Sequence, residues 1–274
     1  MEVRAIHQAF NSDRKNVDGT AYGCTGAVGA FGGGPSVLST KLIYHTIRDV
    51  AVDLPPVFLL LWRSRERGLY EKRVTRPDSR IVIEGFPRCG NTFAYYAFQL
   101  MQPKPVHIGN HMHCVSQFAL ARRWKVPAIL LTRAPRETIV SNFIYDSGLP
   151  LTYHLRRYVG FHNSARRFAD TLVISDFPET TTAFGRVVMR VNDRFGTRFV
   201  PIGDTAEEQN RVLAAIEGTV RWRKEMFSEV TRPNRVAFPS ADKDARKAMV
   251  EEMLQAPKYR DLLQRAEDAH RALL

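Results

Sequence analysis

The chain has 274 residues, of which 44% are hydrophobic, and this composition excludes a globally disordered protein. A chain of this length allows one large α/β domain or two small domains. Forty Lys and Arg residues against 28 Asp and Glu give a formal charge of +12, which favours an anionic partner: a nucleic acid, a membrane surface or a polyanionic small molecule.

The N-terminal part of the chain shows little hydrophobic periodicity. Residues 17–37 are rich in Gly, Ala and Ser, and the first 40 residues lack the basic-then-apolar pattern of a signal peptide. We therefore predict a flexible arm over residues 1–38, unless translation starts later, and one α/β domain over residues 39–274. The three cysteines have no disulfide-scaffold spacing, which indicates a reducing, cytoplasmic compartment.

Residues 39–72 predict one or two helices that lead into the domain. The longest apolar stretch, Val57 to Trp62, is too short to span a bilayer, and Arg63, Arg65 and Arg67 follow it. The preferred interpretation is a buried turn of helix that is followed by basic residues. The alternative is a membrane-associated protein with peripheral contact through residues 54–67.

From Arg80 onward, short apolar runs alternate with helical patterns. Strands are predicted at 81–83, 106–108, 127–131 and 172–174, and helices at 92–101, 115–124, 135–145, 180–195, 206–229, 242–254 and 258–273. This alternation predicts a single α/β domain with a parallel β-sheet flanked by helices on both faces. Ligands of such sheets bind outside the carboxyl ends of the strands. The predicted site walls are therefore residues 84–92, 109–114, 132–141 and 175–177.

The segment from Gly85 to Thr92 follows a predicted strand and opens a predicted helix. It has the spacing of the phosphate-binding loop G-x-x-x-x-G-K-S/T, with Asn91 at the lysine position. Its glycines allow close backbone approach, and free N–H groups at the helix start point at an anion. Because the lysine that neutralises terminal phosphates is missing and Arg88 is the only cation in the loop, this P-loop-like segment indicates a ligand other than a γ-phosphate donor.

Extended to Phe93, the segment resembles the 5′-phosphosulfate-binding loop of sulfotransferases that use 3′-phosphoadenosine 5′-phosphosulfate (PAPS), roughly P-K/R-S/T-G-T/N-T-W/F. The resemblance implies that Arg88 contacts the phosphosulfate and that Phe93 stacks on adenine. The resemblance also implies that four further residues bind the 5′-phosphate: Cys89, Gly90, Asn91 and Thr92. Cys89 stands where the family has Ser or Thr and lacks that hydroxyl group.

A second pattern begins with Arg133 at a predicted strand end, followed by Pro135 and, eight residues after the arginine, by Ser141. A serine inside a helix is disfavoured unless its hydroxyl has a partner, and an arginine offers forked donors to phosphate. The pattern is similar to the family's 3′-phosphate signature R-x-P-x5-S. A surface arginine and a solvated serine would explain either residue alone. The two motifs together favour a 3′,5′-bisphosphorylated nucleoside.

Three histidines and a cysteine crowd the end of the second predicted strand: His107, His111, His113 and Cys114. Imidazole and thiolate are zinc ligands, but no typical zinc spacing occurs here. The second interpretation is a general base that titrates near neutral pH. The resemblance implies that His111 is this base and leaves His113 as a substitute. The family's lysine two residues before the base is Gly109 here.

These features predict a PAPS-dependent sulfotransferase that acts on a hydroxyl or amine by in-line displacement. His111 would take the acceptor proton while Arg88 balances charge on the departing phosphate oxygen, and the scheme needs no metal. The acceptor is a small molecule, carbohydrate or lipid, with candidate walls at 144–160 and 201–240. The sequence leaves its identity and the oligomeric state open. A late basic segment adds candidates for the 3′-phosphate site: Arg232, Arg235 and Ser240.

Two alternatives remain. A P-loop kinase-like phosphotransferase would use Asp176, which ends the fourth predicted strand, but the missing loop lysine argues against it. A nucleic-acid-binding protein would use the +12 charge. The basic residues are spread along the chain without interleaved aromatics, so no nucleic-acid partner is expected.

Overall fold

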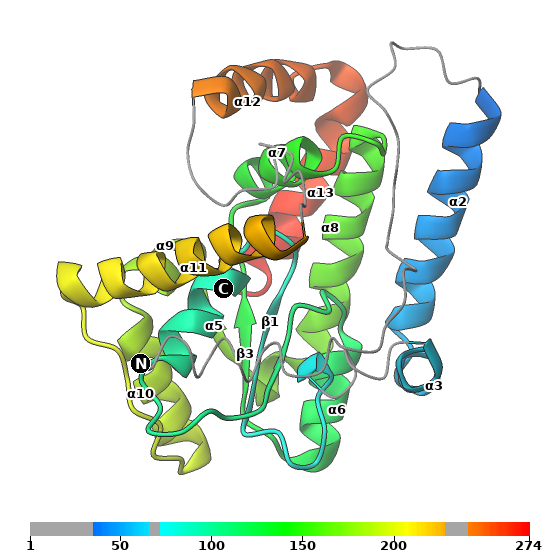
Figure 1. Ribbon diagram of the computed structural model, residues 1–274. Coiled ribbons are helices and arrows are strands. Elements are labelled where there is room, and N and C mark those ends of the chain that lie inside the picture. The colour runs from blue at the N-terminus through cyan, green and yellow to red at the C-terminus, as the bar shows by residue number, and fades with distance from the viewer. Residues whose placement is uncertain (1–34, 66–71, 228–240) are drawn as a thin grey trace.

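The computed structural model describes residues 35–65, 72–227 and 241–274 of the chain. At its centre lies a parallel sheet (Figure 1) of four described strands in the order β2-β1-β3-β4. The strands are β1 (Ile81–Gly85), β2 (Ile108–Asn110), β3 (Ala128–Leu131) and β4 (Val173–Ser175). Nearly all their side chains are buried, because helices cover both faces of the sheet. The predicted α/β fold with a parallel sheet is confirmed.

Helices follow each strand and make up most of the described chain. They are α2 (Pro35–Val52), α3 (Pro55–Arg65), α5 (Asn91–Gln99), α6 (Ser116–Trp124), α7 (Pro135–Tyr145), α8 (Leu151–Ala165), the 3-10 helix η2 (Arg166–Thr171), α9 (Phe177–Thr182), α10 (Phe184–Phe195), α11 (Ala206–Phe227), α12 (Ala241–Leu254) and α13 (Pro257–Arg271). The main core joins the strands to side chains such as Phe98 of α5 and Tyr158 of α8.

Several element boundaries differ from the predictions. Strand β2 begins at Ile108, not at 106, because the N–H of Arg80 pairs with the carbonyl of His107 (2.9 Å) and ladder pairing starts at the next residue. The helix predicted over 180–195 is two helices, separated at Ala183, where φ is −143°. Helix α2 begins at Pro35, so the last four residues of the predicted arm are helical. Residues 1–34 of that arm lie outside the described chain.

Helix α8 was not predicted. It overlaps the segment 144–160 that was a candidate acceptor wall, and nine of its 15 residues are buried. Leu155 and Tyr158 are fully buried in the main core, and α8 packs against α7 and α13. The buried side chains of α8 in this segment therefore belong to the core, and the acceptor wall stays a prediction.

Helix α3 contains the apolar stretch that suggested membrane contact. Phe58 is buried in a second core cluster with Val74, Cys114 and Leu120, as the preferred interpretation requires, whereas Leu60 is 69% exposed. Trp62 and the arginines after it lie outside the residues whose side chains are described. None of the described helices is both long enough and apolar enough to cross a membrane.

Candidate functional site

The four strands end at one edge of the sheet, and the predicted site walls follow directly from these ends. At this edge β1 and β3 approach each other closely. A Cβ atom on Gly85 would lie 2.3 Å from the backbone oxygen of Leu131, so only glycine fits at this position. The glycine that opens the phosphate loop is thus required by the packing of the strands.

The phosphate loop turns sharply into helix α5. Arg88 and Gly90 have φ angles of +73° and +88°. The side-chain amide of Asn91 is buried and donates to the carbonyl of Phe86 (2.9 Å), which closes the loop and leaves no cation at this position. Gly90 is the N-cap and offers no side-chain acceptor, so the first-turn amides of α5 present the positive end of the helix to an anion.

Cys89 faces the core. Its side chain is fully buried, and burial raises the pKa of its thiol to about 12, so the thiol stays protonated at neutral pH. Its N–H donates to the carbonyl of Phe86 at 3.3 Å. The N–H of Cys89 is therefore already engaged, and its thiol faces the core rather than the loop.

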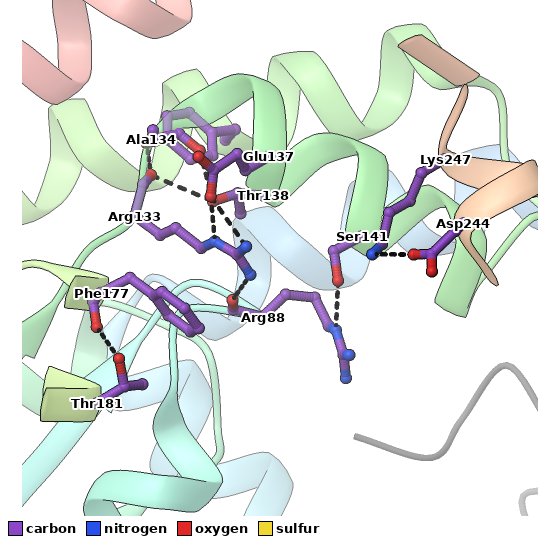
Figure 2. A network of polar contacts seen from close by, with 11 residues as sticks. Arg88, Arg133, Ala134, Glu137, Thr138, Ser141, Phe177, Thr181, Asp244 and Lys247 are labelled. Atoms are coloured by element: carbon purple, nitrogen blue, oxygen red, sulfur yellow. Dashed lines mark hydrogen bonds and ion pairs between the residues drawn. The ribbon is translucent and has the colours of Figure 1, made fainter. Parts of the chain in front are cut away.

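The two sequence motifs meet in space, as Figure 2 shows. Nε of Arg88 donates to Oγ of Ser141 at 3.0 Å, and Nη1 of Arg133 donates to the Arg88 carbonyl at 3.4 Å. The Arg133 guanidinium also lies over the ring of Phe177, 3.9 Å from its centroid. Residues 53 positions apart thus form one basic cluster at the carboxyl edge of the sheet.

The two arginines differ in their electrostatic partners. Arg133 donates from Nε (3.0 Å) and Nη2 (2.9 Å) to one carboxylate oxygen of Glu137. Arg88 forms no ion pair with a carboxylate in the described part of the chain. Burial lowers the pKa of the Arg88 guanidinium, Tyr145 partly offsets this, and the charge of Arg133 lowers the pKa further. Because an arginine keeps its proton, Arg88 is a partly buried cation that an anion would stabilise.

His111 lies beside the phosphate loop with a defined tautomer. Nδ2 of Asn110 donates to the carbonyl of Ile108 (2.7 Å), so Oδ1 of Asn110 faces Nδ1 of His111 (2.8 Å) and must accept its proton. In the neutral ring, Nε2 then carries the lone pair. This atom lies 3.2 Å from Oγ1 of Thr92, whose hydroxyl donates to it. The lone pair of the neutral ring therefore points toward the Thr92 hydroxyl of the loop.

His113 has a different support. Its Nδ1 lies 2.8 Å from the Gly85 carbonyl and 3.4 Å from Oε1 of Glu84. Glu84 is fully buried and accepts the N–H groups of Gly85 (3.0 Å) and Met112 (2.7 Å). The sequence analysis placed Glu84 in a predicted site wall but gave it no role, although an acidic residue next to an apolar run is a signal for one.

Backbone strain is concentrated at this edge. Within the described residues, four non-glycine residues have positive φ: Arg88, His111, His113 and Lys125. Lys125 ends helix α6, where this conformation is common, but the other three belong to the candidate site. Such conformations cost energy and cluster at functional sites, which supports a functional role for the loop and the histidines.

The remaining predicted residues have other surroundings. His107 pairs with Oγ of Ser79 (2.9 Å) and Cys114 is buried in the second core cluster. No group of three or more His, Cys, Asp or Glu side chains among residues 35–65, 72–227 and 241–274 could hold a metal ion, so the zinc alternative finds no cluster there.

Asp176 caps α9 by accepting the N–H of Glu179 (2.8 Å). Phe93 is half-buried against the main core. The late candidates lie outside the described residues: Arg232, Arg235 and Ser240.

Comparisons with known proteins give only distant structural likenesses. No protein-family model matches the chain, and no curated protein matches its sequence. Among solved structures, a crystal structure of a mouse sulfotransferase complexed with PAP is similar, with 14% sequence identity and a TM-score of 0.38. The match covers 75% of this chain and 91% of the mouse chain.

Proposed function

We propose that the chain is a sulfotransferase that transfers a sulfuryl group from PAPS to an acceptor hydroxyl or amine. The observation that carries the proposal is the contact between Arg88 and Ser141 (3.0 Å), with Arg133 beside them. The only cation of the phosphate loop meets the serine of the second motif there. A ligand with two separated anionic groups suits such a site better than a nucleoside triphosphate does.

The two anionic groups have distinct candidate partners. The N-terminus of α5 and the Arg88 guanidinium would hold the phosphosulfate, because Arg88 forms no carboxylate pair among the described residues. Arg133 and Ser141 would hold the 3′-phosphate. Arg133 is already paired with Glu137. A phosphate at this position would therefore either replace the Glu137 carboxylate or share the Arg133 guanidinium with it.

The chemistry that these residues support is in-line displacement at sulfur. Nε2 of His111 takes the proton of the acceptor as the acceptor's oxygen or nitrogen bonds to sulfur. The bond from sulfur to the 5′-phosphate oxygen breaks, and Arg88 balances the charge that develops on that oxygen. Until an acceptor arrives, the Thr92 hydroxyl holds the His111 lone pair toward the loop (3.2 Å).

Calorimetric titration of adenosine 3′,5′-bisphosphate into the protein without metal tests the proposal. We expect binding that Arg133→Ala weakens by about 10- to 100-fold, the loss expected when a hydrogen bond between charged groups is removed. Arg136→Ala, at an exposed arginine in the first turn of α7, is the matched control and leaves binding unchanged. Tight binding of ATP with magnesium and no preference for a 3′-phosphate would overturn the proposal in favour of a kinase.

A further inference from the structure

Helix α2 forms one edge of the molecule (Figure 1, right). Exposed apolar side chains form a stripe along this helix. The stripe consists of Ile43 (55% exposed), Ile47 (64%) and Val50 (63%), and Leu54 (52%) continues it in the turn after the helix. We call these four residues the α2 seam. So many aliphatic side chains on one exposed face of a helix indicate a surface that another molecule covers.

The opposite face of α2 is polar and holds the helix against the body. Asp49 pairs with Nε of Arg157 (3.1 Å) and accepts the hydroxyl of Tyr153, both on α8. Asp53, just after α2, accepts the N–H of Val115 (3.1 Å). Lys41 pairs with Asp146 (3.7 Å). These contacts determine which face of α2 points outward, so the helix has its polar side inside and its apolar side outside.

The spacing of the α2 seam is that of a helix-pairing surface. Its residues follow one another by four, three and four positions, which is the narrow stripe along which two helices meet in a coiled coil. The seam is also free of charge. The exposed residues described between 40 and 54 are Thr40, Ile43, Tyr44, Thr46, Ile47, Val50 and Leu54.

We propose that the α2 seam binds the α2 seam of a second copy of this chain. Two chains of charge +12 repel each other, and an uncharged face is where they can approach without bringing like charges together. A helix that inserts into a lipid surface has cations along its polar face. On α2 the cations Lys41 and Arg48 are paired with Asp146 and Asp49 instead. The charge pattern therefore favours a second copy over a membrane, and the symmetric pairing is isologous.

Sedimentation velocity of the full chain over a range of concentrations tests the pairing. We expect the mass to rise from the 31.2 kDa of one chain to twice that value, with micromolar affinity because the seam is short. Ile47→Glu and Ile47→Lys each abolish the dimer, because like charges would meet at the centre of the seam. An equimolar mixture of the two variants restores it. Met189→Glu, at an exposed apolar residue on α10, is the matched control and leaves the dimer intact.

Other results would overturn the pairing. A chain that stays monomeric at all concentrations, or a dimer that survives in Ile47→Glu, shows that the α2 seam does not join two copies. Co-sedimentation with phosphatidylglycerol vesicles, present in the unmodified chain and lost in Ile47→Glu while the chain stays monomeric, assigns the seam to a lipid surface instead. Circular dichroism of the variants checks that the exposed substitutions leave the fold unchanged.

Discussion

At the scale of single residues, three groups of the candidate site are held by neighbours to which the sequence analysis gave no role. Asn110 sets the tautomer of His111, Glu84 lies under His113, and Glu137 pairs with Arg133. These partners orient the histidine rings and neutralise the charge of Arg133. Their substitution should therefore change the tautomer of His111 or the affinity for an anion, which a merely structural role would not do.

The tautomer of His111 can be observed directly. We expect the ring to carry its proton on Nδ1 at neutral pH, because the fixed Oδ1 of Asn110 accepts it (2.8 Å). Nitrogen-detected NMR of the imidazole measures this, and Asn110→Ala should mix the two tautomers. A ring already protonated on Nε2 in the unmodified chain would contradict the assignment of His111 as a base oriented toward the loop.

Glu137 competes with an anionic ligand for Arg133. Glu137→Gln should therefore tighten binding of adenosine 3′,5′-bisphosphate. We expect a gain of roughly two- to fivefold, since an ion pair with a 59% exposed carboxylate is worth less than about 1 kcal/mol. Calorimetry measures the gain. Asp204→Asn, which breaks the exposed pair with Arg186, is the control without effect. Weaker binding in Glu137→Gln would show that the carboxylate orients Arg133 for the ligand.

At the scale of elements, the site depends on how closely the strands approach at their carboxyl ends. Gly85 lets β1 lie against β3, and Gly90, with φ of +88°, turns the chain into α5. The loop between these glycines then brings Arg88 to Ser141 on α7. The site is thus a consequence of sheet packing rather than of the loop alone.

Gly85→Ala tests this dependence. The new Cβ would lie 2.3 Å from the backbone oxygen of Leu131, and neither strand can move without loss of pairing. We expect the free energy of unfolding to fall by about 1–3 kcal/mol, as in other overpacked cores. Urea denaturation measures it. Gly160→Ala in α8 is the matched control, because its Cβ meets nothing within 4 Å, and it should stabilise the protein by about 0.5–1 kcal/mol. Equal effects of the two substitutions would contradict the packing argument.

At the scale of the whole molecule, the core contains two neutral histidines on α8. Burial lowers the pKa of His154 to about 4 and that of His162 to about 3. His162 is fully buried, stacks on Tyr158 and lies 3.1 Å from the hydroxyl of Thr132. Charging either ring would leave a cation in the core, which links folding to pH.

The sign of this linkage follows from the two states. Below about pH 6.5 the unfolded chain protonates both histidines, whereas the folded chain does so only near pH 4 and pH 3. Stability should therefore fall as the pH drops from 6.5, by about 2 kcal/mol per histidine at pH 5. Urea denaturation at pH 7 and pH 5 measures the loss, which should be smaller in His162→Gln. The same loss in the variant would show that His162 does not carry this dependence.

The sequence by itself determined what depends on neighbours in the chain. Apolar runs indicate the four strands, and the spacing of glycines and Thr92 indicates the phosphate loop, because turns and helix starts have local geometric requirements. Arg88, Arg133 and Ser141 were singled out by the resemblance to two motifs of sulfotransferases. Their predicted ligand roles stay predictions, but the structure does bring them together.

Only the tertiary structure decided what depends on distant contacts. Helix α8 was missed because its histidines look polar in the sequence, yet they become neutral when other elements bury them. The support of His113 by Glu84 and the outward face of α2 likewise require partners that lie 28 or more positions away. Local patterns carry no information about such partners, since burial and pairing are properties of the assembled fold.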